Sequence, residues 1–236
     1  MSRLDFFLWV ALPYLCIATF VVGHIWRYRR DQYTWTARST QLLERRLLML
    51  GSLLLHFGIL AAIGGHVLGI LVPRSWTETF GISDSVYHWL AVVAGTLSGA
   101  AVVAGFGILV YRRIRLGRVR ATTSRGDLAL YPVLGVVILF GMLATVWGTA
   151  IDRYAYRSSV SLWFRGIFTL HPHESLMANA SFIFQAHALS AWLLVAIWPF
   201  TRLVHAWSFP LLYVRRAPIL YRTGRPQTAY LHERAE

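Results

Sequence analysis

The sequence predicts an all-α membrane protein, a bundle of five transmembrane helices. Of its 236 residues, 56% are apolar and only 14% are charged, whereas an ordinary soluble domain has about 25% charged residues. The mean hydropathy is +0.51. A helix crosses a bilayer with about 20 apolar residues, and five stretches reach that length, at about 6–25, 47–72, 86–111, 128–151 and 180–203.

The first stretch, 6–25, is expected to remain as a permanent helix. Only Arg3 precedes it as a basic residue, and no small-x-small cleavage site follows it. Its apolar run is also longer than that of a cleaved signal peptide.

The next three stretches also read as helices. The second, 47–72, carries His56 and His66. The third, 86–111, contains small residues four apart, at Gly95 and Gly99 and again at Ala101 and Gly105, a spacing typical of close helix packing. Like the others, the fourth, 128–151, is nearly free of acidic residues in its core.

The fifth stretch, 180–203, carries His187, and His205 just after it is expected on the same helix, with an expected kink at Pro199. The longest connection, 152–179, has about 28 residues and is too short to form an independent core. We therefore expect residues 1–236 to form a single membrane-integral domain, with a C-terminal tail of about 206–236.

Arginine predicts the orientation of the bundle. All 23 basic residues are arginine, and 17 of them lie in the loops 26–46 and 112–127 and in the tail. The opposite side has five. Since cytoplasmic loops carry the excess of basic residues, the N-terminus is predicted outside and the C-terminus in the cytoplasm.

Composition excludes several other classes of protein. The net charge is +13, but the arginines alternate with apolar runs, so we expect no nucleic-acid partner and expect membrane lipid instead. The single cysteine, Cys16, excludes a disulfide scaffold, a Cys-ligated zinc site and an all-Cys iron–sulfur cluster within this chain. The 10 Trp, 11 Tyr and 13 Phe exclude a disordered chain.

Four histidines inside the predicted spans are the main candidates for function, because ionisable residues are costly there. The second and fifth spans run in opposite directions, so His66 lies level with His187 near the outer side and His56 lies level with His205 near the cytoplasm. Two histidine pairs at two depths are what two bis-histidine haems require. The alternative is that these histidines form hydrogen bonds with each other or with polar neighbours across the helices.

The spacing along each helix is compatible with two haems without proving them. His56 and His66 are 10 residues apart, about 15 Å of rise, whereas His187 and His205 are 18 residues apart, about 27 Å. Helix tilt and a kink at Pro199 are needed to absorb the difference.

Other residues near these depths are weaker candidates. Arg112, Arg113 and Arg202 lie at the cytoplasmic boundary, where they are candidates for haem propionate contacts. The alternatives are anchoring by the positive-inside rule and contact with an acidic face of a partner subunit. Tyr87 and His88 open the third span at about the level of His66. A hydrogen bond from His88 to a quinone oxygen and an interfacial aromatic belt are equally compatible with that position.

Several stretches, in a region from about Pro13 to Tyr213, resemble the gamma subunit of respiratory nitrate reductases. They are Leu55-His56-Phe57-Gly58-Ile59-Leu60 followed by Gly65-His66, Gln32-Tyr33-Thr34-Trp35, Arg118-Val119-Arg120-Ala121-Thr122-Thr123, Phe182-Ile183-Phe184-x2-His187, and Pro199-Phe200-Thr201-Arg202-Leu203-Val204-His205-x-Trp207-Ser208-x-Pro210.

The resemblance implies a cytochrome b with two haem b groups that oxidises quinol, either ubiquinol or menaquinol. It implies His56 and His205 as ligands of the inner haem and His66 and His187 as ligands of the outer haem, with quinol near Gly65 and His66. The family pattern also has a basic residue where this chain has Tyr87 and His88.

The resemblance further implies partners and a location. The partners are an iron–sulfur beta subunit and a molybdenum-containing alpha subunit of nitrate reductase on the cytoplasmic face. The location is the inner membrane of a prokaryotic cell, with multiple spans. Two alternatives remain: the dihaem subunit of another quinone-linked complex, such as a formate dehydrogenase, hydrogenase or heterodisulfide-reductase-like assembly, and a haem-free anchor or transporter.

Overall fold

The computed structural model describes residues 2–208 and consists of helices and connecting loops over that range. Five helical segments are long and apolar enough to cross a membrane, and they confirm the five predicted spans. Their bounds are Arg3–Arg30, Arg46–Leu71, Asp84–Arg115, Arg125–Ile151 and Phe182–Phe200. The predicted tail, 206–236, lies almost entirely outside the described residues.

Most spans join an α-helix to a short segment of different pitch. The first is α1 (Arg3–Phe6), the π-helical η1 (Phe7–Ala11) and α2 (Leu12–Arg30); the second is α3 (Arg46–His66) and the π-helical η3 (Val67–Leu71); the third is α5 (Asp84–Arg115) alone; the fourth is α7 (Arg125–Leu143) and the π-helical η4 (Ala144–Ile151); the fifth is α10 (Phe182–Ile197) and the 3-10 turn η6 (Trp198–Phe200).

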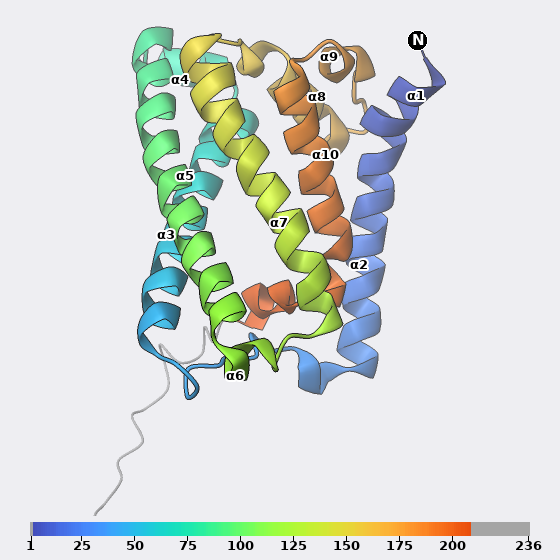
Figure 1. The fold of residues 1–236 in the computed structure, drawn as a ribbon. Coiled ribbons are helices and arrows are strands. Elements are labelled where there is room, and N and C mark those ends of the chain that lie inside the picture. The colour runs from blue at the N-terminus through green and yellow to red at the C-terminus, as the bar shows by residue number, and fades with distance from the viewer. Residues whose placement is uncertain (1, 209–236) are drawn as a thin grey trace, which may run out of the picture.

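Short helices occupy both ends of the bundle. At one end lie α4 (Arg74–Thr79), η5 (Tyr156–Ser158), α8 (Val160–Phe168) and α9 (Glu174–Ala178); at the other lie η2 (Gln32–Thr34), α6 (Gly117–Arg120) and η7 (Arg202–Ser208). Figure 1 shows α4 and α9 at the top and α6 at the bottom. We refer to these two ends as the α9 end and the α6 end.

Local sequence explains where the two long central helices begin. The Ser83 side chain accepts a hydrogen bond from the Val86 amide and caps α5. Ser124 and Asp127 form a reciprocal capping box at the start of α7. Both helices therefore begin at defined residues, which fixes the direction in which each later side chain of α5 and α7 points.

The helices form two packed groups. Helix α3 packs mainly on α5, and α10 packs mainly on α7 and α2. The α3–α5 contact is close because Gly58 lies against α5: a Cβ on Gly58 would lie 2.8 Å from Val102 Cγ2 and 2.9 Å from the Ser98 carbonyl oxygen. Contacts of α5 with α7 and η4 connect the two groups.

The connection 152–179 packs on the bundle. Trp163 and Ile167 of α8 and Met177 of α9 are almost fully buried, and they share a core with Trp9 and Phe184 of the spans. The indole Nε1 of Trp163 donates to the Trp9 carbonyl at 2.7 Å. The α9 end is thereby closed by an aromatic layer.

Candidate functional site

The structure brings the four histidines of the spans together as two pairs. The ring centroids of His66 and His187 lie 6.0 Å apart, and those of His56 and His205 also lie 6.0 Å apart. The first pair joins α3 to α10, and the second joins α3 to η7. Each pair therefore crosses between the two packed groups of helices.

All four imidazoles use Nδ1 to contact a backbone carbonyl. His56 and His66 contact the carbonyl oxygens of Ser52 and Ala62 at 2.7 Å. His187 contacts that of Val137 at 3.2 Å, and His205 that of Arg202 at 2.5 Å. A carbonyl only accepts, so Nδ1 carries the proton in each ring. Each Nε2 is then left with its lone pair, and no Nε2 of these four forms a hydrogen bond within residues 2–208.

This arrangement fits a pair of metal-bound imidazoles. Histidines that bind a metal usually donate the other ring N–H to a carbonyl, a carboxylate or water. Two imidazoles bound at about 2 Å to opposite sides of one metal ion have centroids roughly 6 Å apart. His56 and His66 are also exposed although they face the other group of helices, so there is open space beside both rings.

The fifth span is shorter than predicted, and His205 is not part of it. The helix ends at Phe200, Thr201 is extended, and the chain then turns into η7. The prediction that the fifth helix carries both His187 and His205 is therefore wrong. The 18-residue spacing does not translate into 27 Å of rise, and the turn after Pro199 places His205 opposite His56.

Arg27 stabilises this turn. Its side chain is buried, and its guanidinium donates to the carbonyl oxygens of Pro199 at 2.6 Å, Thr201 at 2.8 Å and Thr34 at 2.9 Å. The first two carbonyls belong to the interrupted helix end, where no amide further along the helix is available to bind them. Nothing in the sequence signals this role, because Arg27 and Pro199 are 172 positions apart in the chain.

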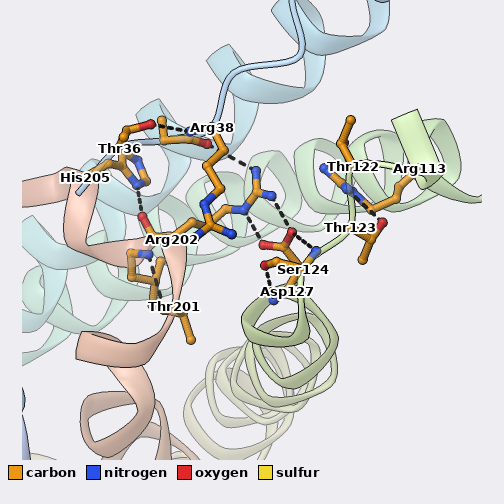
Figure 2. Close-up of polar contacts among 12 residues, drawn as sticks. Thr36, Arg38, Arg113, Thr122, Thr123, Ser124, Asp127, Thr201, Arg202 and His205 are labelled. Carbon is orange, nitrogen blue, oxygen red and sulfur yellow. Dashed lines mark hydrogen bonds and ion pairs between the residues drawn. The ribbon is translucent and has the colours of Figure 1, made fainter. Parts of the chain in front are cut away.

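Arg202 also fixes His205, through an ion pair with Asp127. Nε and Nη2 of Arg202 donate to Oδ1 and Oδ2 of Asp127, both at 2.6 Å, and the Arg202 carbonyl accepts from His205 Nδ1 (Figure 2). Burial lowers the pKa of the Arg202 guanidinium, but its hydrogen bonds with Asp127 outweigh this and raise the pKa above its usual value.

The other two arginines expected at haem propionates are also engaged with the chain. Arg112 is buried and donates four hydrogen bonds, two to Glu44 and two to Thr40. Arg113 Nη1 donates to Thr123 and to the Val119 carbonyl, and its guanidinium lies 5.5 Å from the Tyr131 ring centre. Both therefore bind the loops at the α6 end together.

Of the residues expected at the quinol, Tyr87 and His88 lie on two faces of α5, and Gly65 lies on α3. Tyr87 is buried, and its hydroxyl lies 3.1 Å from that of Tyr156. His88 is half-buried beside Trp89, with ring centroids 5.8 Å apart. Gly65 is exposed, and a Cβ there would meet no atom of residues 2–208 within 4 Å. The face of α3 next to His66 is thus open.

The expected packing role of the α5 glycines is confirmed. A Cβ on Gly95 would lie 3.0 Å from Thr145 Cγ2, one on Gly99 would clash with Met142, and one on Gly105 would clash with the α3 backbone. Gly141 on α7 was missed. A Cβ there would lie 3.0 Å from Cε1 of His187, so the absence of a side chain makes room for that ring.

Fold and site together define a five-span membrane protein with two histidine pairs suited to bis-histidine metal ligation. A family model described as nitrate reductase gamma subunit matches residues 5–224. The chain belongs to this family, as its motifs predicted. The expectation that it is a nitrate reductase subunit, and not a subunit of another quinone-linked complex, is confirmed at the level of the family.

Curated relatives agree with this membership. The chain is 41% identical to the nitrate reductase gamma chain of Bacillus subtilis, over 91% of this chain and 96% of that one. It is 33% identical to the respiratory nitrate reductase 1 gamma chain of Escherichia coli, over 94% and 99%. A nitrate reductase-like protein of Mycobacterium tuberculosis is 44% identical over 91% of this chain, which spans only 33% of that relative's length.

Proposed function

We propose that the chain is a membrane cytochrome b that takes electrons from quinol at its α9 end and delivers them to a nitrate reductase at its α6 end. The observation that supports this best is the pairing of four histidines, with both centroid distances at 6.0 Å. His66 and His187 would hold one haem b, and His56 and His205 the other. When bound, each haem supplies a one-electron carrier whose iron has no open position for oxygen or substrate.

The chain's own residues orient these ligands. The carbonyls of Ser52, Ala62, Val137 and Arg202 fix the protonated Nδ1 atoms and aim Nε2 away from the backbone. Two ligands come from α3, which packs closely on α5 and therefore serves as a rigid support. The other two come from α10 and η7, on the opposite side of the open space.

Quinol is proposed to bind beside the pair nearest the α9 end, at Gly65 and His66, with Tyr87 and His88 at the start of α5. The distribution of arginines puts this end outside the cell membrane of a prokaryote and the α6 end in the cytoplasm. Protons from the quinol then leave outside while electrons go to the cytoplasm, which contributes to the proton-motive force.

The proposed partners bind at the α6 end. Relatives named as nitrate reductase gamma chains support a nitrate reductase partner, and we propose that its iron–sulfur beta subunit and molybdenum-containing alpha subunit receive the electrons. Arg202, Arg112 and Arg113 would act there by holding the loops and η7 in place, and Arg113 remains a candidate for direct propionate contact.

A reduced-minus-oxidised visible spectrum with a pyridine assay of haem per chain tests this proposal. We expect two b-type haems per purified chain and their re-oxidation when nitrate is added to quinol-reduced membranes. Two haems without a response to nitrate would keep the cytochrome and reject the nitrate reductase partner. No haem, in a folded preparation from haem-replete cells, would leave the histidines with a packing role in a haem-free anchor.

A further inference from the structure

Arg157, in the loop between the fourth and fifth spans, is a cation with unused hydrogen-bond donors. Its guanidinium lies 3.9 Å from the centre of the Tyr87 ring, and Nη2 donates to Thr77 Oγ1 at 3.0 Å. Nε and Nη1 are buried, and neither has a hydrogen-bond partner among the described residues. Buried donors without an acceptor, on a charged group above all, are costly to leave unpaired.

Two tyrosines beside Arg157 add a further unused donor. The hydroxyls of Tyr87 and Tyr156 lie 3.1 Å apart, and one of them donates to the other, so the second hydroxyl proton has no acceptor in this contact. Burial, followed by the hydrogen bond to Tyr87, raises the pKa of the Tyr156 hydroxyl well above its usual range. Tyr156 therefore stays protonated and remains a donor.

This cluster of Arg157, Tyr87 and Tyr156 has no carboxylate partner within residues 2–208. The acidic residues in nearby ion pairs, Glu78 and Asp84, are bound to Arg74. None of the ion pairs formed in this part of the chain includes Arg157. Among the described residues the cluster is thus positively charged, rich in donors and without a carboxylate.

The cluster lies about one helical turn from the histidine pair nearest the α9 end. A Cβ on Gly69, three residues after His66, would lie 2.9 Å from the Tyr87 hydroxyl and 3.2 Å from the Tyr156 hydroxyl. The Tyr156 ring stacks on Phe184, with centroids 6.1 Å apart, and Phe184 precedes His187 by three residues. Three residues of helix correspond to about 4.5 Å of rise.

We propose that Arg157, with the hydroxyls of Tyr87 and Tyr156, binds a propionate carboxylate of the haem held by His66 and His187. This inference rests on the proposed function, because it requires a haem at that pair. A carboxylate provides the negative charge and the acceptor oxygens that the cluster lacks. Arginine is the residue best suited to such a group because its planar guanidinium presents several N–H donors at once.

Pairing with Arg157 makes a measurable difference to that haem. Without the cation, the carboxylate charge is no longer compensated and favours the oxidised, more positive iron. An Arg157→Met variant is therefore expected to lower the reduction potential of the outer haem and to leave the inner haem unchanged. We expect about a tenfold change in the ratio of reduced to oxidised haem, which for one electron equals 59 mV.

The experiment is a redox titration of the visible haem bands in the full chain, with two comparison variants. Arg157→Lys keeps the charge and should recover part of the shift. Arg153→Met removes the same charge from the same loop at an exposed residue and should give no shift. Equal potentials for wild type and Arg157→Met would overturn the inference while leaving the proposed function in place.

An infrared measurement on the wild type covers the case in which Arg157→Met loses both haems because it does not fold. The wild type is prepared with haem carrying 13C-labelled propionates, and redox difference spectra are recorded at pH 7. We expect only ionised carboxylate bands for the outer haem. A band of protonated propionic acid there would overturn the inference, and a wild type without haem would overturn the proposed function and this inference together.

Discussion

Asp127 and Arg202 form a two-point ion pair that connects the start of α7 to the turn carrying His205. Both hydrogen bonds are 2.6 Å, and the Asp127 side chain is 1% exposed while that of Arg202 is 18% exposed. Asp127 also belongs to the capping box of α7. One carboxylate thus fixes both a helix start and the position of a proposed haem ligand.

Asp127→Asn is expected to lose the inner haem selectively. Removing one partner of a buried ion pair costs about 3–5 kcal/mol, and the turn that places His205 loses its anchor. Haem per chain should fall from two to one, with the outer haem spectrum retained. Asp152→Asn, an exposed acid of the connecting loop, is the control; loss of the outer haem in Asp127→Asn would contradict the prediction.

Replacing Arg27 should weaken the turn after Pro199 that places His205, because Arg27 donates to the carbonyls of Pro199 and Thr201. Arg27→Met leaves the carbonyls of Pro199, Thr201 and Thr34 without their donor, at about 1–3 kcal/mol for each one that stays buried. We expect a lower melting temperature in detergent and a shifted inner haem spectrum. Arg29→Met, an exposed change on the same helix, should alter neither quantity, and equal effects of the two variants would show that the three carbonyls do not depend on Arg27.

Gly141 provides a test of the outer pair that leaves all four histidines intact. In Gly141→Val the new side chain occupies the space of the His187 ring, so His187 is displaced and the outer haem is lost. The matched control is Gly107→Val, because a Cβ on Gly107 meets no atom of the described part of the chain within 4 Å. Retention of both haems in Gly141→Val would show that His187 adopts another position when it binds haem.

Acid should release the loop that Glu44 holds against Arg112. Partial removal from water raises the pKa of the Glu44 carboxyl, but hydrogen bonds from Arg112 and from the amides of Leu47 and Leu48 outweigh this and hold it below its ordinary value. A depressed pKa contributes stability above the unfolded value, about 4.3, which is lost as the pH falls through the folded value.

Thermal melting of the wild type and of Glu44→Gln in detergent checks this prediction. The wild type should be the more stable of the two at pH 7, and the difference should disappear as the pH is lowered below about 4. A difference that persists in acid would assign the effect of the variant to a cause other than the ionised carboxylate.

The membrane spans and the histidine pairs could be predicted from the sequence, because both depend on position along the chain. Apolar length predicts a span, and opposite helix directions predict that His66 faces His187 and that His56 faces His205. The exact residue at which the fifth helix ends could not be predicted from the sequence. It depends on which side chains donate to the carbonyls that the interruption after Pro199 leaves without a helical partner. Arg27 does so from a residue 172 positions away.

The arginines likewise show that position along the chain can be read from the sequence, whereas contacts between distant residues cannot. Their number per loop predicts orientation, but not which of them become buried. Arg112 and Arg202 are bound by acids that come from distant parts of the chain, Glu44 and Asp127. Arg157 is assigned to the outer side by its loop alone. It acquired a candidate role only from its contact with Tyr87 and from its Nε and Nη1, which have no partner among residues 2–208.

The two packed groups of helices have a consequence for how the protein is made. The α3–α5 pair and the α2–α7–α10 group each bury their own contacts, so the chain can enter the membrane and fold as far as these two units before any cofactor arrives. A cofactor held by the histidine pairs would add bonds between two units that already touch through α5, α7 and η4, and its binding energy would add to the folding energy.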